Sequence, residues 1–338
     1  MDPQSFIEAI QANPGDEIPR LVYADWLDEQ GDPRGELIRI QCEIARRPDN
    51  DLKRKQLEVG AEELLAEYGE TWLEPLRELG AVGVSARCFH LGLVERLKIS
   101  TEDFLSNVEA LCQIEPALTM VQLTNIGPYI DEFAKEQIPP QITTLDLSGN
   151  KLTALHCQTL CGSTITDQLT TLDLKFNHLD NAALGDLCAV TWPKLQRLDL
   201  SRNRIGLDGA SILASQSTLP ELKVLQLGMN RIGDEGFSAL LKSQSLGKLE
   251  ELHLGSNGIG NASVSNLLDR VTRKSMMTLK DSTSTVELVK SELPPALKVL
   301  NLRYNRIGIE EQKRLKNSAL MQYLDTLDLT GNVRESAY

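Results

Sequence analysis

The sequence predicts an α/β solenoid, in which short parallel strands line one face and helices line the other, preceded by an all-helical segment. Three observations predict this fold class. The pattern LxxLxLxxN recurs along the chain, 56 of the 338 residues are leucine, and the apolar spacing changes from two to about 3.6 after each copy. Aromatic residues make up only 4% of the chain, so the predicted core is aliphatic.

The repeat is present in seven clear copies. They are ITTLDLSGN (142–150), LTTLDLKFN (169–177), LQRLDLSRN (195–203), LKVLQLGMN (222–230), LEELHLGSN (249–257), LKVLNLRYN (297–305) and LDTLDLTGN (324–332). The fourth-position residues are Leu145, Leu172, Leu198, Leu225, Leu252, Leu300 and Leu327, spaced 27, 26, 27, 27, 48 and 27 residues apart. Two weaker copies around Leu97 and Val121 bring the predicted number of repeats to about nine.

Each copy predicts the same strand, turn and helix. The two leucines of LxL point inward from a short strand, while the residue between them points outward. The asparagine turns the chain, and stacked copies predict a ladder of asparagine side chains bonded to backbone groups of neighbouring coils. Segments such as 204–216 and 231–244 then read as helices. Because the helical side of each coil is wider than the strand side, stacking predicts a horseshoe with the strands on its concave face.

The amino-terminal region reads as helices. Apolar spacing predicts a helical hairpin over 5–47 and a further helix over about 51–68. We expect these helices to cover the first coil of the solenoid, since open solenoid ends expose apolar surface. A separate docking role remains open as the alternative, carried by the charged side chains of Asp25, Asp28, Glu29 and Arg34.

Two family resemblances follow from these residues. The pattern LxxLxLxxNxIGDEGxxxL, over about residues 90–335, resembles the ribonuclease-inhibitor-like class of leucine-rich repeats. The segment DEIPRLVYADWLDEQGDPRGELIRIQCEIAR (16–46) is similar to the bacterial repeat-companion domain, which implies architecture and no biochemical activity. The predicted division is therefore a helical repeat-companion or capping domain over 1–80 and a leucine-rich repeat domain over 81–338. The 48-residue spacing predicts an insertion at about 263–295, a loop or extra helix that is either tolerated or a binding element.

Composition restricts the class of partner. The formal net charge is −13, and residues 1–80 carry 19 acidic against 9 basic side chains. An acidic chain disfavours nucleic acid and anionic lipid as main partners, because both require a basic surface. No apolar run is long enough to span a membrane, and the amino terminus lacks the features of a secretory signal, so we expect a cytoplasmic, bacterial-type protein.

The sequence predicts no enzyme site, cofactor or metal. The phosphate-loop, dinucleotide-binding, zinc-protease and nucleophile-elbow patterns are missing. The six cysteines form no CxxC pair and are expected to be free, buried thiols: Cys42, Cys88, Cys112, Cys157, Cys161 and Cys188.

The predicted function is a protein-interaction scaffold that binds an unidentified protein through the concave face. The candidate residues are the outward strand positions and the position just before each asparagine: Asp146, Asp173, Phe176, Asp199, Arg202, Gln226, Met229, His253, Asn301 and Tyr304. Exposed Tyr, Phe, Met and Arg often supply most interface energy, although LDLS and NRI segments are also simply common in this repeat class. We expect a monomer, or a weak dimer through the incomplete carboxyl-terminal coil.

A second function remains open. Ran GTPase-activating proteins share this repeat class and act on a bound GTPase with an arginine or asparagine beside an early coil. The resemblance would assign that role to Arg202, Arg204 or Arg231, but the chain lacks the long acidic tail of that family.

Overall fold

The structure is a computed structural model that describes residues 3–13, 15–278 and 293–332, with side chains of the last helix before the gap described up to residue 271. The chain divides into two compact parts, Met1–Asp146 and Leu147–Tyr338, called here the N-terminal part and the C-terminal part. Nine short parallel strands, β3 to β11, follow one another in chain order, as expected for the predicted α/β solenoid of leucine-rich repeats.

The N-terminal part begins with four helices, α1 (Pro3–Ala12), α2 (Glu17–Glu29), α3 (Arg34–Ala45) and α4 (Leu52–Glu78). The predicted hairpin corresponds to α2 and α3, but α1 is a separate helix, because Asp16 caps α2 by accepting a hydrogen bond from Ile18 N at 2.9 Å. The helix expected over 51–68 continues ten residues further than predicted. It includes Pro75, and Leu73 and Leu76 of its last turns are fully buried.

Three parallel strands and two repeat helices complete the N-terminal part. A short antiparallel pair that the sequence did not predict comes first, β1 (Phe89–His90) with β2 (Leu93–Val94). Then follow β3 (Arg96–Ser100), α5 (Thr101–Ile114), β4 (Met120–Thr124), α6 (Ile130–Phe133) and β5 (Thr144–Asp146), with 3₁₀ turns at Ala86–Cys88 and Gly127–Tyr129. The two weak copies of the repeat are therefore genuine strands.

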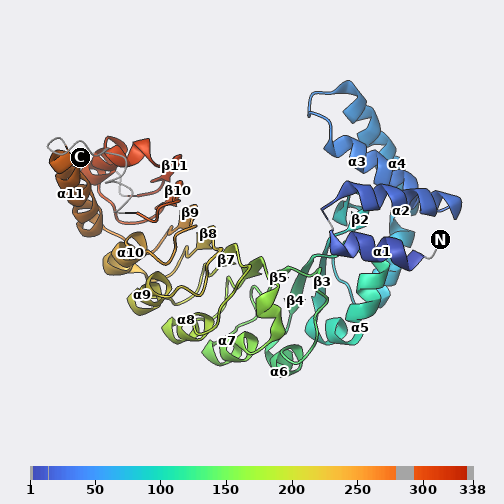
Figure 1. Cartoon of the computed structure of the whole chain (residues 1–338), viewed down its shortest axis with the longest axis horizontal. Helices are drawn as coiled ribbons and strands as arrows, with labels where there is room; N and C mark the ends of the chain where they lie inside the picture. Colours follow the sequence, from blue (N-terminus) through green and yellow to red (C-terminus); the bar gives the residue numbers. More distant parts are fainter. Residues whose placement is uncertain (1–2, 14, 279–292, 333–338) are drawn as a thin grey trace. The chain divides into compact units, whose positions relative to one another are not determined.

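The C-terminal part alternates strands and helices. Its strands are β6 (Thr171–Asp173), β7 (Arg197–Asp199), β8 (Val224–Gln226), β9 (Glu251–His253), β10 (Val299–Asn301) and β11 (Thr326–Asp328). Its helices are α7 (Ala154–Cys161), α8 (Asn181–Leu187), α9 (Leu207–Ser215), α10 (Gly233–Leu241), α11 (Asn261–Thr278) and α13 (Ile309–Lys316), with 3₁₀ turns at Thr164–Asp167 and Ala319–Gln322. In this part the strands lie on the inner side and the helices on the outer side (Figure 1).

The predicted strand register is confirmed. Leu198 pairs with Leu172 on one side and Leu225 on the other, and the ladder continues through Leu252, Leu300 and Leu327. In the N-terminal part Leu97, Val121 and Leu145 pair in the same way. Because side chains alternate along a strand, this register places the LxL pairs inside and the intervening residues on the opposite face of the sheet.

The asparagine ladder is also present in the C-terminal part. The Asn203 amide nitrogen donates to the backbone oxygens of Leu174 and Leu200, each at 3.0 Å, and its oxygen accepts from Leu179 N at 3.0 Å. The same three bonds recur at Asn177 and Asn230. Each buried asparagine thus ties its own turn to the preceding coil.

We expect Asn203→Ala to destabilise the C-terminal part by about 1–3 kcal/mol, because it leaves buried backbone groups without partners. Hydrogen exchange at the Leu179 amide should accelerate accordingly. The control is Asn317→Ala, which removes an exposed asparagine at the end of α13 and should change stability by less than about 0.5 kcal/mol. Equal protection in the two variants would contradict the ladder.

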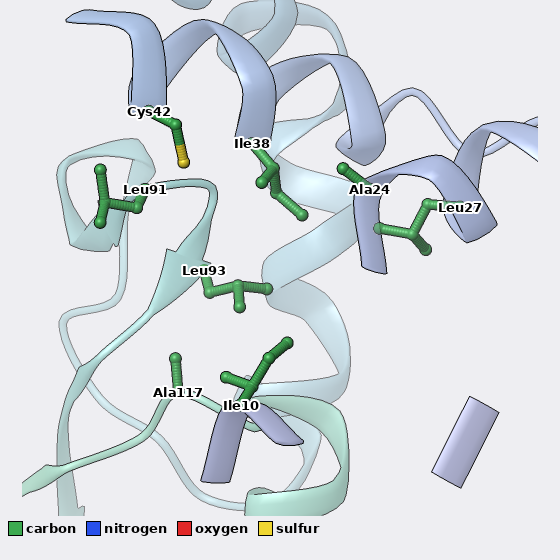
Figure 2. Packing of buried hydrophobic residues seen from close by; sticks show 8 residues of the cluster. All are labelled: Ile10, Ala24, Leu27, Ile38, Cys42, Leu91, Leu93 and Ala117. Atoms are coloured by element: carbon green, nitrogen blue, oxygen red, sulfur yellow. The ribbon is translucent and has the colours of Figure 1, made fainter. Parts of the chain in front are cut away.

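The helices of the N-terminal part pack on the β1–β2 pair. Their shared core comprises Ile10, Ala24, Leu27, Ile38, Cys42, Leu91, Leu93 and Ala117 (Figure 2). At Gly35 a Cβ would lie 2.6 Å from the Ala24 carbonyl oxygen, so α2 and α3 approach more closely there than any larger residue allows. Helices α1, α2 and α3 therefore share one apolar core with the β1–β2 pair.

Two arginines of the 16–46 segment are buried and structural. Arg34, predicted as a docking charge, instead forms an ion pair with Glu115 at 2.5 Å and donates from Nε to the Gly92 oxygen at 3.1 Å. Arg20, fully buried, bonds Glu95 at 2.5 Å and the His90 oxygen at 3.1 Å. The docking interpretation is therefore wrong for Arg34, because its guanidinium is buried in the N-terminal part and bound to Glu115 and Gly92 there.

All six cysteines are unpaired, and all but Cys88 are buried. Burial raises the pKa of Cys112 and Cys161 to about 12 and that of Cys188 to about 11. These thiols are protonated near neutral pH and therefore poor nucleophiles.

The predicted insertion at 263–295 begins inside a helix. Helix α11 has 18 residues, whereas α10, at the equivalent place in the preceding repeat, has nine. The rest of the predicted insertion, 279–292, lies outside the described residues.

Candidate functional site

The outward strand residues of the C-terminal part form a continuous column. Asp173, Asp199, Gln226, His253 and Asn301 lie on neighbouring strands in register, and Asp328 ends the column on β11. The sequence predicted this alignment. We call the surface that these residues share with the positions just before the ladder asparagines the strand face.

Asp146 departs from the prediction of an exposed candidate. It ends β5 in the N-terminal part, and its residue is 7% exposed. Because so little of it reaches solvent, its side chain does not offer a surface for a partner.

The acidic and amide side chains of the column first serve the turns. In four repeats the outward Asp or Asn accepts a hydrogen bond from the backbone N–H two residues later: Lys175 N to Asp173 at 2.9 Å, Ser201 N to Asp199 at 2.8 Å, Arg303 N to Asn301 at 3.1 Å and Thr330 N to Asp328 at 2.9 Å. The bond from the Thr330 backbone lowers the pKa of Asp328. These side chains therefore stabilise the turn after each strand, whatever else they contact.

A second column carries the large exposed side chains. Phe176, Arg202, Met229, Ser256 and Tyr304 each precede a ladder asparagine and have φ of 56–58°. The equivalent positions in the first and last repeats of this part are Gly149 and Gly331, also with positive φ. Glycine suits the left-handed region and bulky residues do not, so the middle repeats keep large side chains there against the backbone preference.

These side chains project from the surface. Phe176 is 51% exposed, Met229 46% and Tyr304 60%. The Arg202 guanidinium carbon lies 4.3 Å from the centre of the Phe176 ring, a cation–π contact. At the other end a Cβ on Gly331 would lie 2.2 Å from Cδ1 of the Tyr304 ring, so only glycine there lets this ring approach the next coil so closely.

Between the two columns the strand face is hollowed. The hollow measures about 510 Å³ and is lined by Ser201, Arg202, Gln226, Gly228, Met229, His253, Gly255, Ser256, Asn301, Arg303 and Tyr304. Ser201, Gly228 and Gly255 occupy equivalent positions in consecutive repeats, where Lys175 and Arg303 stand in others. The small residues make the floor, and the larger side chains rise around it.

Polar contacts hold two side chains that line the hollow, Gln226 and His253. The Gln226 amide lies between two neighbours, with its nitrogen 2.8 Å from Asp199 Oδ2 and its oxygen facing the Arg197 guanidinium. His253 Nε2 lies 3.1 Å from Glu251 Oε2. Both side chains are half-buried and held by neighbours on the same strands or the next.

Sequence reasoning selected six of the residues that line the hollow: Arg202, Gln226, Met229, His253, Asn301 and Tyr304. It missed Arg303 and the floor residues Gly228 and Gly255. The available signal was a glycine at the same repeat position in two consecutive copies, a position that the sequence analysis did not consider.

The described residues assemble no group of three or more His, Cys, Asp or Glu side chains that could hold a metal ion. Of the arginines considered for action on a GTPase, only Arg202 lines the hollow, while Arg204 and Arg231 are exposed beyond the asparagines. Across the part of the chain that is described, no helix combines the length and apolarity that crossing a membrane requires.

Comparison with known families identifies the repeat. A family model described as Leucine Rich repeat matches residues 193–214, 219–241 and 248–268, and a second, described as Leucine Rich Repeat, matches 141–163. The chain therefore contains leucine-rich repeats, and three matched segments include β7, β8 and β9 of the hollow. The ribonuclease-inhibitor-like class and the repeat-companion domain stay predictions.

Three solved structures that match the chain share little sequence with it. A Bacteroides fragilis protein is 15% identical over 83% of this chain and 85% of its own, with a TM-score of 0.43. The Arabidopsis receptor kinase HAESA, solved with the peptide hormone IDA and the co-receptor SERK1, is 16% identical over 62% and 40%, with a TM-score of 0.26. An internalin from Listeria monocytogenes is 16% identical over 70% and 81%, with a TM-score of 0.23. No curated protein matches the chain.

Proposed function

We propose that this chain is a protein-interaction scaffold that binds its partner through the strand face of the C-terminal part. The observation that carries the proposal is the second column. Non-glycine residues stand at left-handed backbone positions in five consecutive repeats, four of these residues have large side chains, and three of the four are about half exposed or more. Strained positions with exposed aromatic, methionine and arginine side chains are typical of binding surfaces, because such residues bury a large contact area when a partner binds.

The outward acidic residues have a smaller part in this proposal. Their carboxylates already accept turn hydrogen bonds, and half-buried Asp173 also contacts Lys175 Nζ at 2.6 Å. Such charges mainly affect association rate and salt dependence. We therefore assign the binding energy to Phe176, Arg202, Met229 and Tyr304.

The N-terminal helices are proposed to cap the repeats. Their core includes residues of β2 and of the turn before β4, and the buried pairs of Arg20 and Arg34 reach the same region. The division at residues 80 and 81, the cytoplasmic location and the monomeric or weakly dimeric state stay predictions.

The test is site-specific photo-crosslinking of the full chain. A photoreactive benzoyl-phenylalanine replaces either Tyr304 on the strand face or Leu155, which is 69% exposed on α7. We expect a protein adduct from position 304 and none from position 155. Adducts of equal yield from both positions would contradict binding through the strand face.

Once the partner is identified, its affinity for alanine variants of the strand face is measured. Phe176→Ala, Arg202→Ala and Tyr304→Ala should each weaken binding by about 2 kcal/mol, with the thermal midpoint unchanged. Leu155→Ala is the control and should bind normally. Removal of residues 279–292 supplies the opposing arm, since loss of binding there with normal binding by the three alanine variants would place recognition in the insertion.

A further inference from the structure

The hollow on the strand face differs in charge from the whole chain. Its lining contains two arginines, Arg202 and Arg303, and the histidine His253, but no carboxylate. The chain carries a formal net charge of −13. A site without acidic lining in so acidic a protein indicates an anionic ligand group.

Three carboxylates close to the hollow already have partners in the fold. Asp199 accepts from Ser201 N, and Glu251 contacts His253. Asp328 accepts from Thr330 N, and this bond and then the Arg303 charge lower its pKa. Across the described part of the chain, neither Arg202 nor Arg303 forms an ion pair within 4.0 Å. Both arginines are exposed, so their guanidinium groups remain available to a ligand.

The two guanidinium groups are held at opposite ends of the hollow. Arg202 leans over the Phe176 ring, at the repeat of β6. Arg303 lies back across Gly255, at the repeat of β9, because a Cβ on that glycine would be 2.9 Å from Arg303 Cγ and 3.4 Å from its Nε. Three strand spacings separate these repeats, or roughly 14 Å.

We propose that the hollow binds an extended acidic segment of the partner protein, with two carboxylate side chains about four residues apart. An extended chain rises about 3.3 Å per residue, so four residues span the separation of the arginines. The middle residue of the three between the two carboxylates of the partner segment points to the same side as they do. It is apolar and lies over Gly228 and Gly255 beside Met229 and Tyr304. This inference rests on the proposed function and specifies the partner's chemistry at the same face.

The geometry favours carboxylates on a peptide over other anions. One phosphate group cannot reach both arginines across roughly 14 Å, whereas two side chains of one strand can. Each guanidinium presents a planar fork that matches a carboxylate in two parallel hydrogen bonds. A nucleic acid would meet the strongly negative remainder of the chain.

The experiment measures fluorescence anisotropy of labelled nine-residue peptides with the full chain. The probe has glutamate at positions three and seven, leucine at five and serine or glycine elsewhere. The comparison peptides carry glutamine, lysine or phosphoserine at positions three and seven. We expect the glutamate peptide to bind at least tenfold more tightly than the glutamine and lysine peptides, with affinity falling as salt rises.

Charge reversal identifies the arginines responsible. The double variant Arg202→Glu and Arg303→Glu should bind the glutamate peptide at least tenfold more weakly than the wild type does. It should bind the lysine peptide more tightly than the glutamate peptide. The matched control, Arg204→Glu and Arg306→Glu, makes the same charge change at exposed arginines outside the hollow and should keep the wild-type preference. Equal thermal midpoints for the two double variants show that the repeats stay folded.

Three results would overturn the inference: no binding of the glutamate peptide, equal binding of the glutamate and glutamine peptides, or tighter binding of the phosphoserine peptide. The photo-crosslinking result is separate from these. A protein adduct at position 304, found together with any of the three, leaves the strand face as the binding surface and rejects only the acidic segment.

Discussion

We expect the Arg34→Ala variant to lose about 3–5 kcal/mol of stability in the N-terminal part. Arg34 holds the Glu115 carboxylate at 2.5 Å, and the side chains of the pair are 9% and 0% exposed. Glu115 also accepts a hydrogen bond from Val94 N at 2.8 Å. Removing the guanidinium leaves a buried carboxylate without its counter-charge, which is far more costly than the loss of a surface ion pair.

The loss should depend on pH. Burial raises the pKa of Glu115, and the Arg34 charge is the main influence that lowers it again. Without Arg34 the folded-state pKa of Glu115 rises further above its unfolded value. The folded state of the variant is therefore most stable, relative to the wild type, at pH values where Glu115 is protonated. Its deficit should therefore be small in acid, below the unfolded pKa, and grow as the pH rises through the raised folded pKa. Hydrogen exchange of the Val94 amide across this pH range measures the effect.

Arg39→Ala is the matched control in the same helix. Arg39 binds Asp25 at 2.7 Å and Asp28 at 2.5 Å, but these side chains are 37%, 73% and 44% exposed. We expect a change of less than about 1 kcal/mol. If Arg34→Ala and Arg39→Ala were equally stable at neutral pH, the buried ion pair would have no role in fastening the helices to the repeats.

The second large effect is expected from Leu225→Ala, at about 2–5 kcal/mol. Leu225 is fully buried and lies between Leu198 and Leu252 in the middle of the C-terminal part. The substitution removes apolar contacts and leaves a cavity that coils on both sides cannot close, because each is tied by its own asparagine. Urea unfolding followed by tryptophan fluorescence, to which Trp192 contributes together with Trp26 and Trp72, detects the loss, and hydrogen exchange locates it in the C-terminal part.

Leu207→Ala provides the comparison, since Leu207 on α9 is 43% exposed and should cost less than about 0.5 kcal/mol. The loss in Leu225→Ala should spread to the neighbouring coils, since repeats stabilise one another through nearest-neighbour contacts. An unchanged urea midpoint in Leu225→Ala would mean that the strand register is wrong.

The repeat architecture could be predicted in detail because its signal is local. The LxL alternation and the asparagine three residues after it specify strand, inward face and turn within nine residues, and the copies then stack in one register. Even the weak copies form strands in this register, because Leu97 pairs with Val121 and Val121 pairs with Leu145. The candidate column Asp173, Asp199, Gln226, His253 and Asn301 followed from the same alternation.

The N-terminal part was predicted less well, because its interactions are distant in sequence. Arg34 looked like a surface charge, yet its partner Glu115 lies 81 residues away. Helix α4 continued past the predicted end because Leu73 and Leu76 find buried neighbours, which apolar spacing alone does not show. The β1–β2 pair is too short to leave a pattern.

The sequence by itself determined the repeat, its register, the inward leucines and the hydrogen-bonding asparagines, because these depend on a residue spacing that is present in every copy. Only the tertiary structure decided which charges are buried and where the strand face is hollow. The hollow needs Gly228 beside Gly255, Arg303 folded across that glycine and Arg202 stacked on Phe176. Each of these contacts joins residues of different coils, so it exists only after the coils have stacked, and no single repeat contains the information to specify it.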